Sequence, residues 1–335
     1  MQLETKTPTR DARDGRIRTD GLQFFFDAYN RAATMRLLVC GGLFRRPTLL
    51  IVTILVICLD TAPGRAVSLL PLQTQEAATL PSGAGEIVLG GSYFHNPRFP
   101  AFTPANALQS QELVTAPQLA LQIAAGKWVE IQAFYELVYN DQKDAAGNSL
   151  SKFGSGDAQL WTKVRLLSER ERIPGFALRF GTKLPDANAH DHLGTDETDF
   201  TFEALVSKQL GPVAVHANLG ISLLGNPGPP IGAPGSSSSG QDDLFVYAVA
   251  VASSPWSLSQ AHSLKLRVMG EVVGNAGSRF DNERHAARIG LQLSHGNLTG
   301  YLGTSFGLVT GSEDVGVTAG ILYNFTLDRL AGWVE

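Results

Sequence analysis

One short stretch of the sequence, NAHDHLGTDETD (188–199), concentrates side chains that could bind a metal ion. Imidazole and carboxylate groups are common ligands of zinc and calcium. Their spacing here matches no defined metal motif, and the stretch is expected in an exposed loop. We therefore expect a solvated loop, with no metal and no cofactor bound. The residues concerned are His190, Asp191, His192, Asp196 and Asp199.

A serine and a histidine stand side by side in LSHGN, as Ser294 and His295. Hydrolases of the Ser-His type need a nucleophile, a base and an acidic group that orients the base. No acidic residue that could orient His295 is evident. We expect no catalytic residue and no enzyme, and keep a hydrolase as a minor alternative that labelling with a serine-reactive probe would reveal.

The other charged residues of interest alternate with apolar ones. In GFALRFGTKLP, Phe176, Leu178 and Phe180 share one parity, and Arg179 and Lys183 share the other. A period of two predicts a β-strand with one apolar and one charged face. A soluble sandwich turns the apolar face into its core, whereas a membrane barrel turns it toward lipid. The strand alone does not decide between them.

The same alternation recurs along the chain, and no sustained helical period interrupts it. The segments have the length that a tilted transmembrane strand needs. The twelve predicted strands are 86–94, 115–124, 127–138, 156–167, 175–185, 197–208, 213–224, 244–252, 263–273, 284–294, 298–308 and 314–325.

The connections between these strands alternate in length. Tight connections at 125–126, 210–212 and 295–297 alternate with long polar ones such as 139–155 and 186–196. Short turns at one end and long loops at the other are typical of outer-membrane barrels. The low-complexity loop at 225–243 could instead link two domains. We favour one barrel because the alternation continues beyond it.

Charged residues of the predicted strands would then face the lumen. Folding each hairpin about its loop places Arg179 opposite Glu203 and Lys183 opposite Asp199, and brings Glu130 near Lys163 and Arg165. A second group, Lys265, Arg267, Arg284 and Arg288, could bind an anion, or pair with Glu271. Two interpretations stay open: these charges hold the barrel together, or they line a constriction. The predicted lumen residues are Glu130, Lys163, Arg165, Arg179, Lys183, Asp199, Glu203, Lys265, Arg267, Glu271, Arg284 and Arg288, and the predicted lipid-facing residues are Phe176, Leu178, Phe180, Ile221 and Leu291.

Residues 35–66 of the 335-residue chain are expected to form an export signal. TLLIVTILVICL (48–59) is too short to span a bilayer, which takes about 20 residues, and suits a signal peptide with arginines before it and a cleavage site after Ala66. The expected parts are an over-extended start or disordered leader (1–34), a signal peptide (35–66), a periplasmic N-terminal segment (67–85) that could thread the lumen, a barrel (86–325) and a tail (326–335).

Charge and cysteine content exclude other classes. From Val67 onward the chain has 17 basic and 25 acidic residues and no cysteine, since Cys40 and Cys58 precede that point. A net charge of −8 disfavours nucleic acid as a partner. The absence of cysteine excludes disulfides and thiolate metal sites from this part.

The last predicted strand, VGVTAGILYNF, alternates and closes on an aromatic residue. With Tyr323 and Phe325, it resembles the terminal signal by which outer-membrane barrels are recognised for assembly. The barrel-assembly machinery and membrane lipid are therefore expected partners.

Several stretches resemble the outer-membrane family named for the MetA pathway of phenol degradation. They are GDAQLWTKVRLLSERE (156–171), GFALRFGTKLPDAN (175–188) and LGTDETDFTFEALVSKQLGPVAVHANLGISLLGN (193–226), together with the closing strand. The resemblance covers about residues 85–325. It implies a barrel of about twelve strands in the outer membrane of a Gram-negative bacterium, with a role in uptake of small, often aromatic or hydrophobic, compounds. We expect a passive channel for small solutes, with a structural or adhesive barrel of closed lumen as the alternative.

Overall fold

The computed structural model describes residues 68–97, 108–225, 243–259, 263–277 and 283–327. Predictions for residues 1–66 and most of the tail lie outside this range. Within these ranges the chain forms fourteen strands and one 3-10 turn, η1 (Ala189–Asp191). Among the described residues, no helix is both long and apolar enough to cross a membrane. The strands are β1 (Ala84–His95), β2 (Leu108–Ala124), β3 (Val129–Asp144), β4 (Ser149–Ser155), β5 (Gln159–Leu167), β6 (Gly175–Lys183), β7 (Asp199–Leu210), β8 (Val213–Leu223), β9 (Leu244–Ser253), β10 (Trp256–Ser259), β11 (Leu264–Ala276), β12 (Arg284–His295), β13 (Leu298–Gly307) and β14 (Val315–Thr326).

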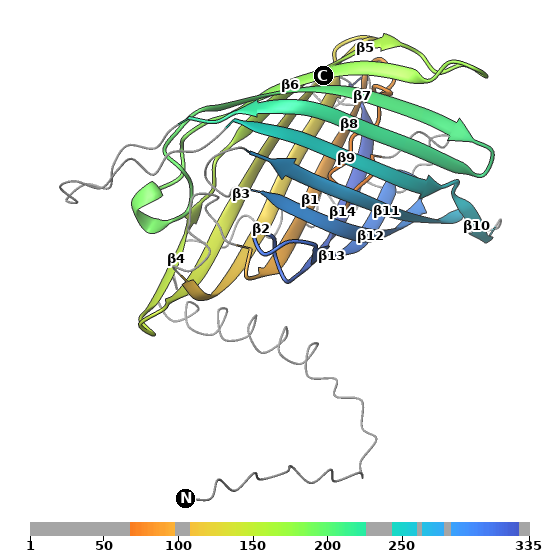
Figure 1. Cartoon of the computed structure of the whole chain (residues 1–335). Coiled ribbons are helices and arrows are strands. Elements are labelled where there is room, and N and C mark those ends of the chain that lie inside the picture. Colours follow the sequence, from red (N-terminus) through yellow and green to blue (C-terminus); the bar gives the residue numbers. More distant parts are fainter. Residues whose placement is uncertain (1–67, 98–107, 226–242, 260–262, 278–282, 328–335) are drawn as a thin grey trace, which may run out of the picture. The chain divides into compact units, whose positions relative to one another are not determined.

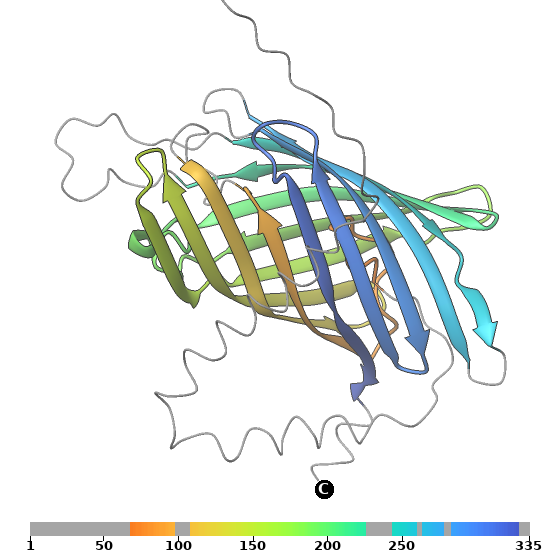
Figure 2. The same cartoon turned by 90° about the horizontal axis from the view of Figure 1, so that it is seen from below.

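The strands form one closed antiparallel sheet (Figures 1 and 2). β1 pairs with β14 from Ala84 opposite Thr326 to His95 opposite Val315, which closes the barrel. β4 and β5 both pair with β3, and β9 and β10 both pair with β11. Each of these two couples acts as one interrupted strand, so the barrel has twelve. The predicted twelve-stranded antiparallel barrel is confirmed.

Residues 139–155 differ from the prediction of a long loop. They continue the sheet as a hairpin of β3 and β4, paired from Leu137 opposite Ser155 to Lys143 opposite Ser149. The reason is that the alternation does not stop at the end of the predicted strand: Asn140 is buried on the inner side, whereas Phe153 is exposed on the outer side. The next predicted strand therefore begins late, at Gln159, after a break at 156–158.

The two ends of the barrel differ in their connections. The short-turn end carries the turns that follow β2, β5, β7 and β12, and also the start of β1 and the end of β14. The long-loop end carries the connections that follow β1, β6, β8, β11 and β13. Such sorting of turns and loops is typical of membrane barrels.

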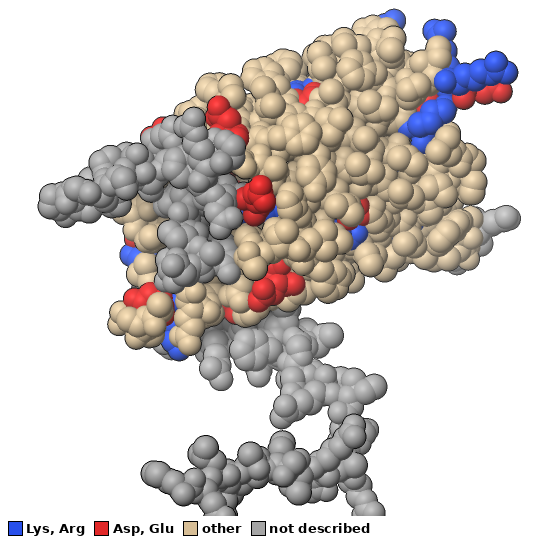
Figure 3. All heavy atoms as spheres, viewed as in Figure 1, with Lys and Arg blue, Asp and Glu red and all other residues tan. Residues whose placement is uncertain are grey.

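The outer surface of the barrel is apolar and its inner surface is polar. Leu178, Ile221 and Leu291 are 43%, 51% and 42% exposed, whereas Arg179 is only 7% exposed. Figure 3 shows one side of this wall, largely free of charged side chains between its two ends. A soluble sandwich would bury the apolar side chains and expose the charged ones. The observed arrangement is the reverse, as lipid contact requires.

Candidate functional site in the barrel interior

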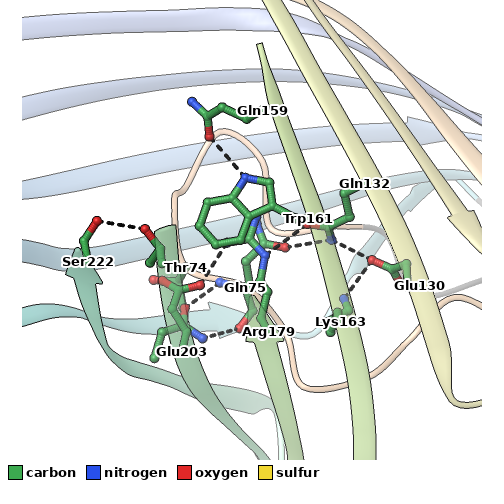
Figure 4. A network of polar contacts seen from close by, with 12 residues as sticks. Thr74, Gln75, Glu130, Gln132, Gln159, Trp161, Lys163, Arg179, Glu203 and Ser222 are labelled. Atoms are coloured by element: carbon green, nitrogen blue, oxygen red, sulfur yellow. Dashed lines mark hydrogen bonds and ion pairs between the residues drawn. The ribbon is translucent and has the colours of Figure 1, made fainter. Parts of the chain in front are cut away.

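Arg179 is the centre of one interior network (Figure 4). Its Nη1 lies 2.9 Å from Glu203 Oε2, and its Nε donates to Gln132 Oε1 at 3.0 Å. The guanidinium carbon stacks 3.7 Å from the centroid of the Trp161 ring. Gly181 makes room for that ring, because a Cβ there would lie 2.2 Å from Trp161 Cδ2. The pair predicted across the β6–β7 hairpin thus forms, with two partners that the sequence analysis missed.

Glu130 and Lys163 form a second interior pair. Lys163 Nζ lies 2.9 Å from Glu130 Oε1, and both side chains are almost fully buried. Arg165, predicted near the same carboxylate, instead donates to the carbonyl oxygen of Lys127 at 2.5 Å and lies 5.1 Å from the Trp128 ring. The register explains the choice, since Lys163 is the residue directly opposite Glu130. Removing one partner of such a buried ion pair lowers the free energy of unfolding by about 3–5 kcal/mol.

Lys183 connects the barrel wall to the loop that follows β6. Its Nζ lies 2.8 Å from Asp199 Oδ2 and 3.2 Å from Asp157 Oδ2, and it also contacts the hydroxyl of Thr195. Asp157 stands in the break between β4 and β5 and accepts a hydrogen bond from the N–H of Ala187. The ammonium group therefore holds loop residues against the wall.

This loop, residues 184–198, is not the exposed loop that the sequence predicts. Leu193 and Ala187 are buried and pack against Leu113 and Val138, which belong to β2 and β3. Side chains of Leu113 and Val138 are themselves buried on the inner side. Folding inward covers these four apolar groups, which explains why the loop enters the mouth of the barrel.

The ligand-type residues of the same loop do not converge. Asp191 pairs with Lys152 at 2.5 Å, and Asp199 with Lys183. Burial lowers the pKa of His192, which keeps its imidazole neutral at neutral pH. Throughout the part of the chain that the structure describes, no group of three or more His, Cys, Asp or Glu side chains could hold a metal ion.

The four cations considered as an anion site are spread along the β11–β12 pair. Lys265 is exposed opposite Ser294 near the short-turn end, whereas Arg284 lies opposite Asn275 at the other end. Arg288 lies 3.5 Å from Glu271 instead. An anion site made of all four is therefore wrong, because the antiparallel register places none of these cations opposite another. Arg267 donates from Nε to the carbonyl oxygen of Ser253 at 3.2 Å.

Residues 68–83, which we call the inner segment, lie inside the barrel. They hydrogen-bond to inward-facing side chains of β3, β7, β8, β11 and β12, among them Glu130, Asn218 and Glu271. A cavity of about 30 Å³ remains between the inner segment and the wall near Glu86 and Lys163. This volume suits one or two water molecules.

A Ser-His contact occurs in the interior, but not at the residues singled out in the sequence. Ser207 Oγ lies 2.9 Å from His216 Nδ1, and the N–H of Ala77 donates to the same hydroxyl at 2.8 Å. His216 stands on the inward-facing side of β8 and is buried. Ser294 shares a hydrogen bond with the hydroxyl of Thr299 at 2.9 Å.

Two aromatic residues end the last strand. Tyr323 lies opposite Ile87, and Phe325 opposite Gly85 in the seam between β1 and β14. A Cβ on Gly85 would lie 2.2 Å from Phe325 Cζ, so the ring covers that glycine. The predicted lipid-facing Phe176 also stands on the outer parity, half-buried.

Comparison with known proteins adds a structural likeness. No family model matches the chain, and no curated protein matches it. The COG4313 outer membrane channel from Pseudomonas putida F1 superposes with a TM-score of 0.53 at 15% identity, over 76% of this chain and 100% of that one. The two chains share a fold. The translocator domain of the autotransporter NalP from Neisseria meningitidis gives a TM-score of 0.47 at 13% identity, over 73% of this chain and 89% of that one.

Proposed function

We propose that this protein is an outer-membrane channel through which small solutes move passively, down their gradient. The observation that carries this proposal is the reversal of polarity across one wall: β6 turns Leu178 outward and Arg179 inward. A closed barrel leaves no unpaired strand edge for lipid to meet, and its polar interior offers a route for water and solutes.

Several features of the chain follow from this proposal. The short-turn end, which holds both barrel termini, faces the periplasm, and the long-loop end faces the outside. The export signal delivers the chain to the envelope of a Gram-negative bacterium. The barrel-assembly machinery then recognises the closing strand with Tyr323 and Phe325.

The solutes that we propose are small and aromatic or hydrophobic. This rests on the sequence resemblance to the MetA-pathway family. The fold shared with the COG4313 outer membrane channel supports a channel and not the choice of solute. The interior ion pairs would set the width and charge of the route. Removing a contact that holds the loop at 184–198 should therefore change conductance. Removing an exposed charge at either end of the barrel should not.

A barrel with a closed lumen is the second candidate. The inner segment and the loop at 184–198 both enter the interior, and this observation favours a lumen that is closed at rest. Such a protein would serve as a structural or adhesive element of the membrane surface.

Conductance across planar bilayers separates the two candidates. The purified protein should give discrete single-channel steps, and aromatic acids added on one side should reduce the ionic current. Heat-denatured protein is the matched control. Bilayers that stay silent at all voltages and pH values would favour the closed barrel.

A further inference from the structure

The inner segment is bound largely through its main chain. Glu271 accepts hydrogen bonds from two successive main-chain N–H groups, from Gln73 at 2.8 Å and from Thr74 at 2.9 Å. The same carboxylate also accepts from the Thr74 hydroxyl at 2.6 Å. Glu271 is itself buried, so these donors, together with Arg288 at 3.5 Å, compensate its charge in the interior.

Asn218 binds both polar groups of one residue. Its Oδ1 accepts from the N–H of Gln75 at 2.6 Å, and its Nδ2 donates to the carbonyl oxygen of Gln75 at 3.0 Å. Two residues further along, Ser207 accepts from the N–H of Ala77 at 2.8 Å. This pattern imitates the hydrogen bonds that a neighbouring strand would supply.

Wall side chains also bind the main chain at both ends of the inner segment. Gln292 Nε2 donates to the carbonyl oxygens of Ser68 and Leu70 at 2.6 and 2.7 Å. At the other end, Glu130 Oε2 accepts from the N–H of Leu80 at 2.8 Å. Apart from the bonds of the Thr74 and Thr79 hydroxyls, these bonds involve main-chain groups of the inner segment and therefore select its sequence only weakly.

Most of the selection comes from apolar pockets, the larger of which lies at the start of the inner segment. Leu69 and Leu72 are buried against Ala250, Ala252 and Met269. The small alanines leave the space that the two leucine side chains fill. These contacts require bulky apolar groups at two fixed positions of the bound chain.

Glycines in the wall receive the proline between these leucines. A Cβ on Gly303 would lie 2.4 Å from Pro71 Cγ, and one on Gly290 would lie 2.8 Å from Pro71 Cδ. Any side chain at Gly303 would therefore collide with the bound segment.

We propose that the inner wall of the barrel is a binding site for an extended peptide, which the chain's own inner segment occupies. Its ligand class is a peptide of about sixteen residues with a Leu-Leu-Pro-Leu start and small residues at the positions of Thr74 and Ala77, which are buried against the wall. Main-chain hydrogen bonds supply affinity in such sites, and pockets for a few side chains supply specificity. A second peptide of this class can enter once the inner segment has left.

The test needs a protein whose own segment is displaced while the wall stays unchanged. The double variant Leu69→Asp and Leu72→Asp places two carboxylates in the larger apolar pocket. Its inner segment should become sensitive to protease, and the barrel itself should stay resistant. A segment that stays protected in this variant would overturn the proposal.

The probe is a fluorescein-labelled peptide, SLLPLQTQEAATLPSG, with the sequence of residues 68–83. Its anisotropy should show at least tenfold tighter binding to the double variant than to the unaltered protein, whose site is occupied. A peptide with Gln73→Ala, which changes a side chain that is exposed in the bound segment, should bind within about threefold of the probe. A peptide with aspartate at the positions of Leu69 and Leu72 should not bind.

Substitutions on β13 locate the bound peptide. Gly303→Val, added to the double variant, should abolish binding because of the collision with Pro71. The control is Gly300→Val, where a Cβ meets nothing within 4 Å. Absence of binding to the double variant, or equal binding with and without Gly303→Val, would overturn the proposal. Peptide binding is measured without any current, so silent bilayers would contradict the channel function and leave this inference standing.

Discussion

Arg179 and Glu203 face each other across β6 and β7, with Nη1 and Oε2 only 2.9 Å apart. Trp161 covers the guanidinium on one side, and Gln132 accepts its Nε–H. The charge is therefore neutralised and hydrogen-bonded where it leaves water. The main role of such a network is to stabilise the barrel. Its secondary role is to shape any solute route that passes beside it.

The first prediction concerns this pair. Arg179→Met leaves the Glu203 carboxylate without its partner and should lower the free energy of unfolding by about 3–5 kcal/mol. Urea unfolding of the protein in detergent, followed by tryptophan fluorescence, measures the change. Adding Glu203→Gln should restore part of the loss, because the uncompensated charge disappears. If the stability losses of Arg179→Met and Glu203→Gln simply added in the double variant, the two side chains would not be coupled, which would contradict this prediction.

The second prediction concerns Lys183. Lys183→Gln removes the charged contacts to Asp157 and Asp199 that hold the loop at 184–198. Hydrogen bonds to charged groups contribute about 1.5–3 kcal/mol each, so amide exchange in the loop should accelerate roughly tenfold or more. Lys208→Gln is the control, since its pair with Glu169 lies at the short-turn end. Unchanged exchange in the loop would show that Lys183 does not hold it.

The third prediction concerns Leu193, the apolar anchor of the same loop. Leu193→Ala should weaken docking of the loop by about 2–3 kcal/mol and raise single-channel conductance, because the loop leaves the mouth more often. Leu150→Ala, at an exposed position, should change neither quantity. A conductance that stays the same while the loop becomes protease-sensitive would show that the loop does not narrow the route.

The fourth prediction concerns the outer wall. Leu178→Arg places a cation on the lipid face within β6 and should cost about 2–4 kcal/mol, whereas Leu210→Arg at the short-turn end should cost about 0–1 kcal/mol. Unfolding from lipid vesicles gives both values. Equal costs at the two positions would argue against a membrane-spanning orientation.

The barrel and its pairs could be predicted because both depend on short-range patterns. Alternation in GFALRFGTKLP marks β6 and its two faces, and folding the chain symmetrically about the connection at 186–196 gives the register that brings Arg179 to Glu203. The hairpin of β3 and β4 was missed, since polar residues such as Asn140 and Lys143 were assigned to a loop although the period of two continued.

The sequence allowed residues 67–85 to thread the lumen, but no pattern in it indicated which wall residues bind the inner segment. Gln75 meets Asn218 and Thr74 meets Glu271, residues 143 and 197 positions away along the chain. The segment's bonds use mostly its main chain, and main-chain groups carry no sequence signature. The inward position of the loop at 184–198 was missed for a related reason. Most of its residues are polar, whereas its packing depends on only two apolar residues, Ala187 and Leu193.

Spin labels on two adjacent residues of β7 test most directly which side of the wall meets lipid. The chain from Val67 onward has no cysteine, so Phe202→Cys and Thr201→Cys can each carry a single nitroxide. In lipid vesicles, oxygen should relax the label at 202 strongly and a water-soluble nickel chelate should not, because this position faces the acyl chains. The label at 201 should respond in the opposite way. Strong relaxation by the nickel chelate at 202 together with protection at 201 would contradict the account.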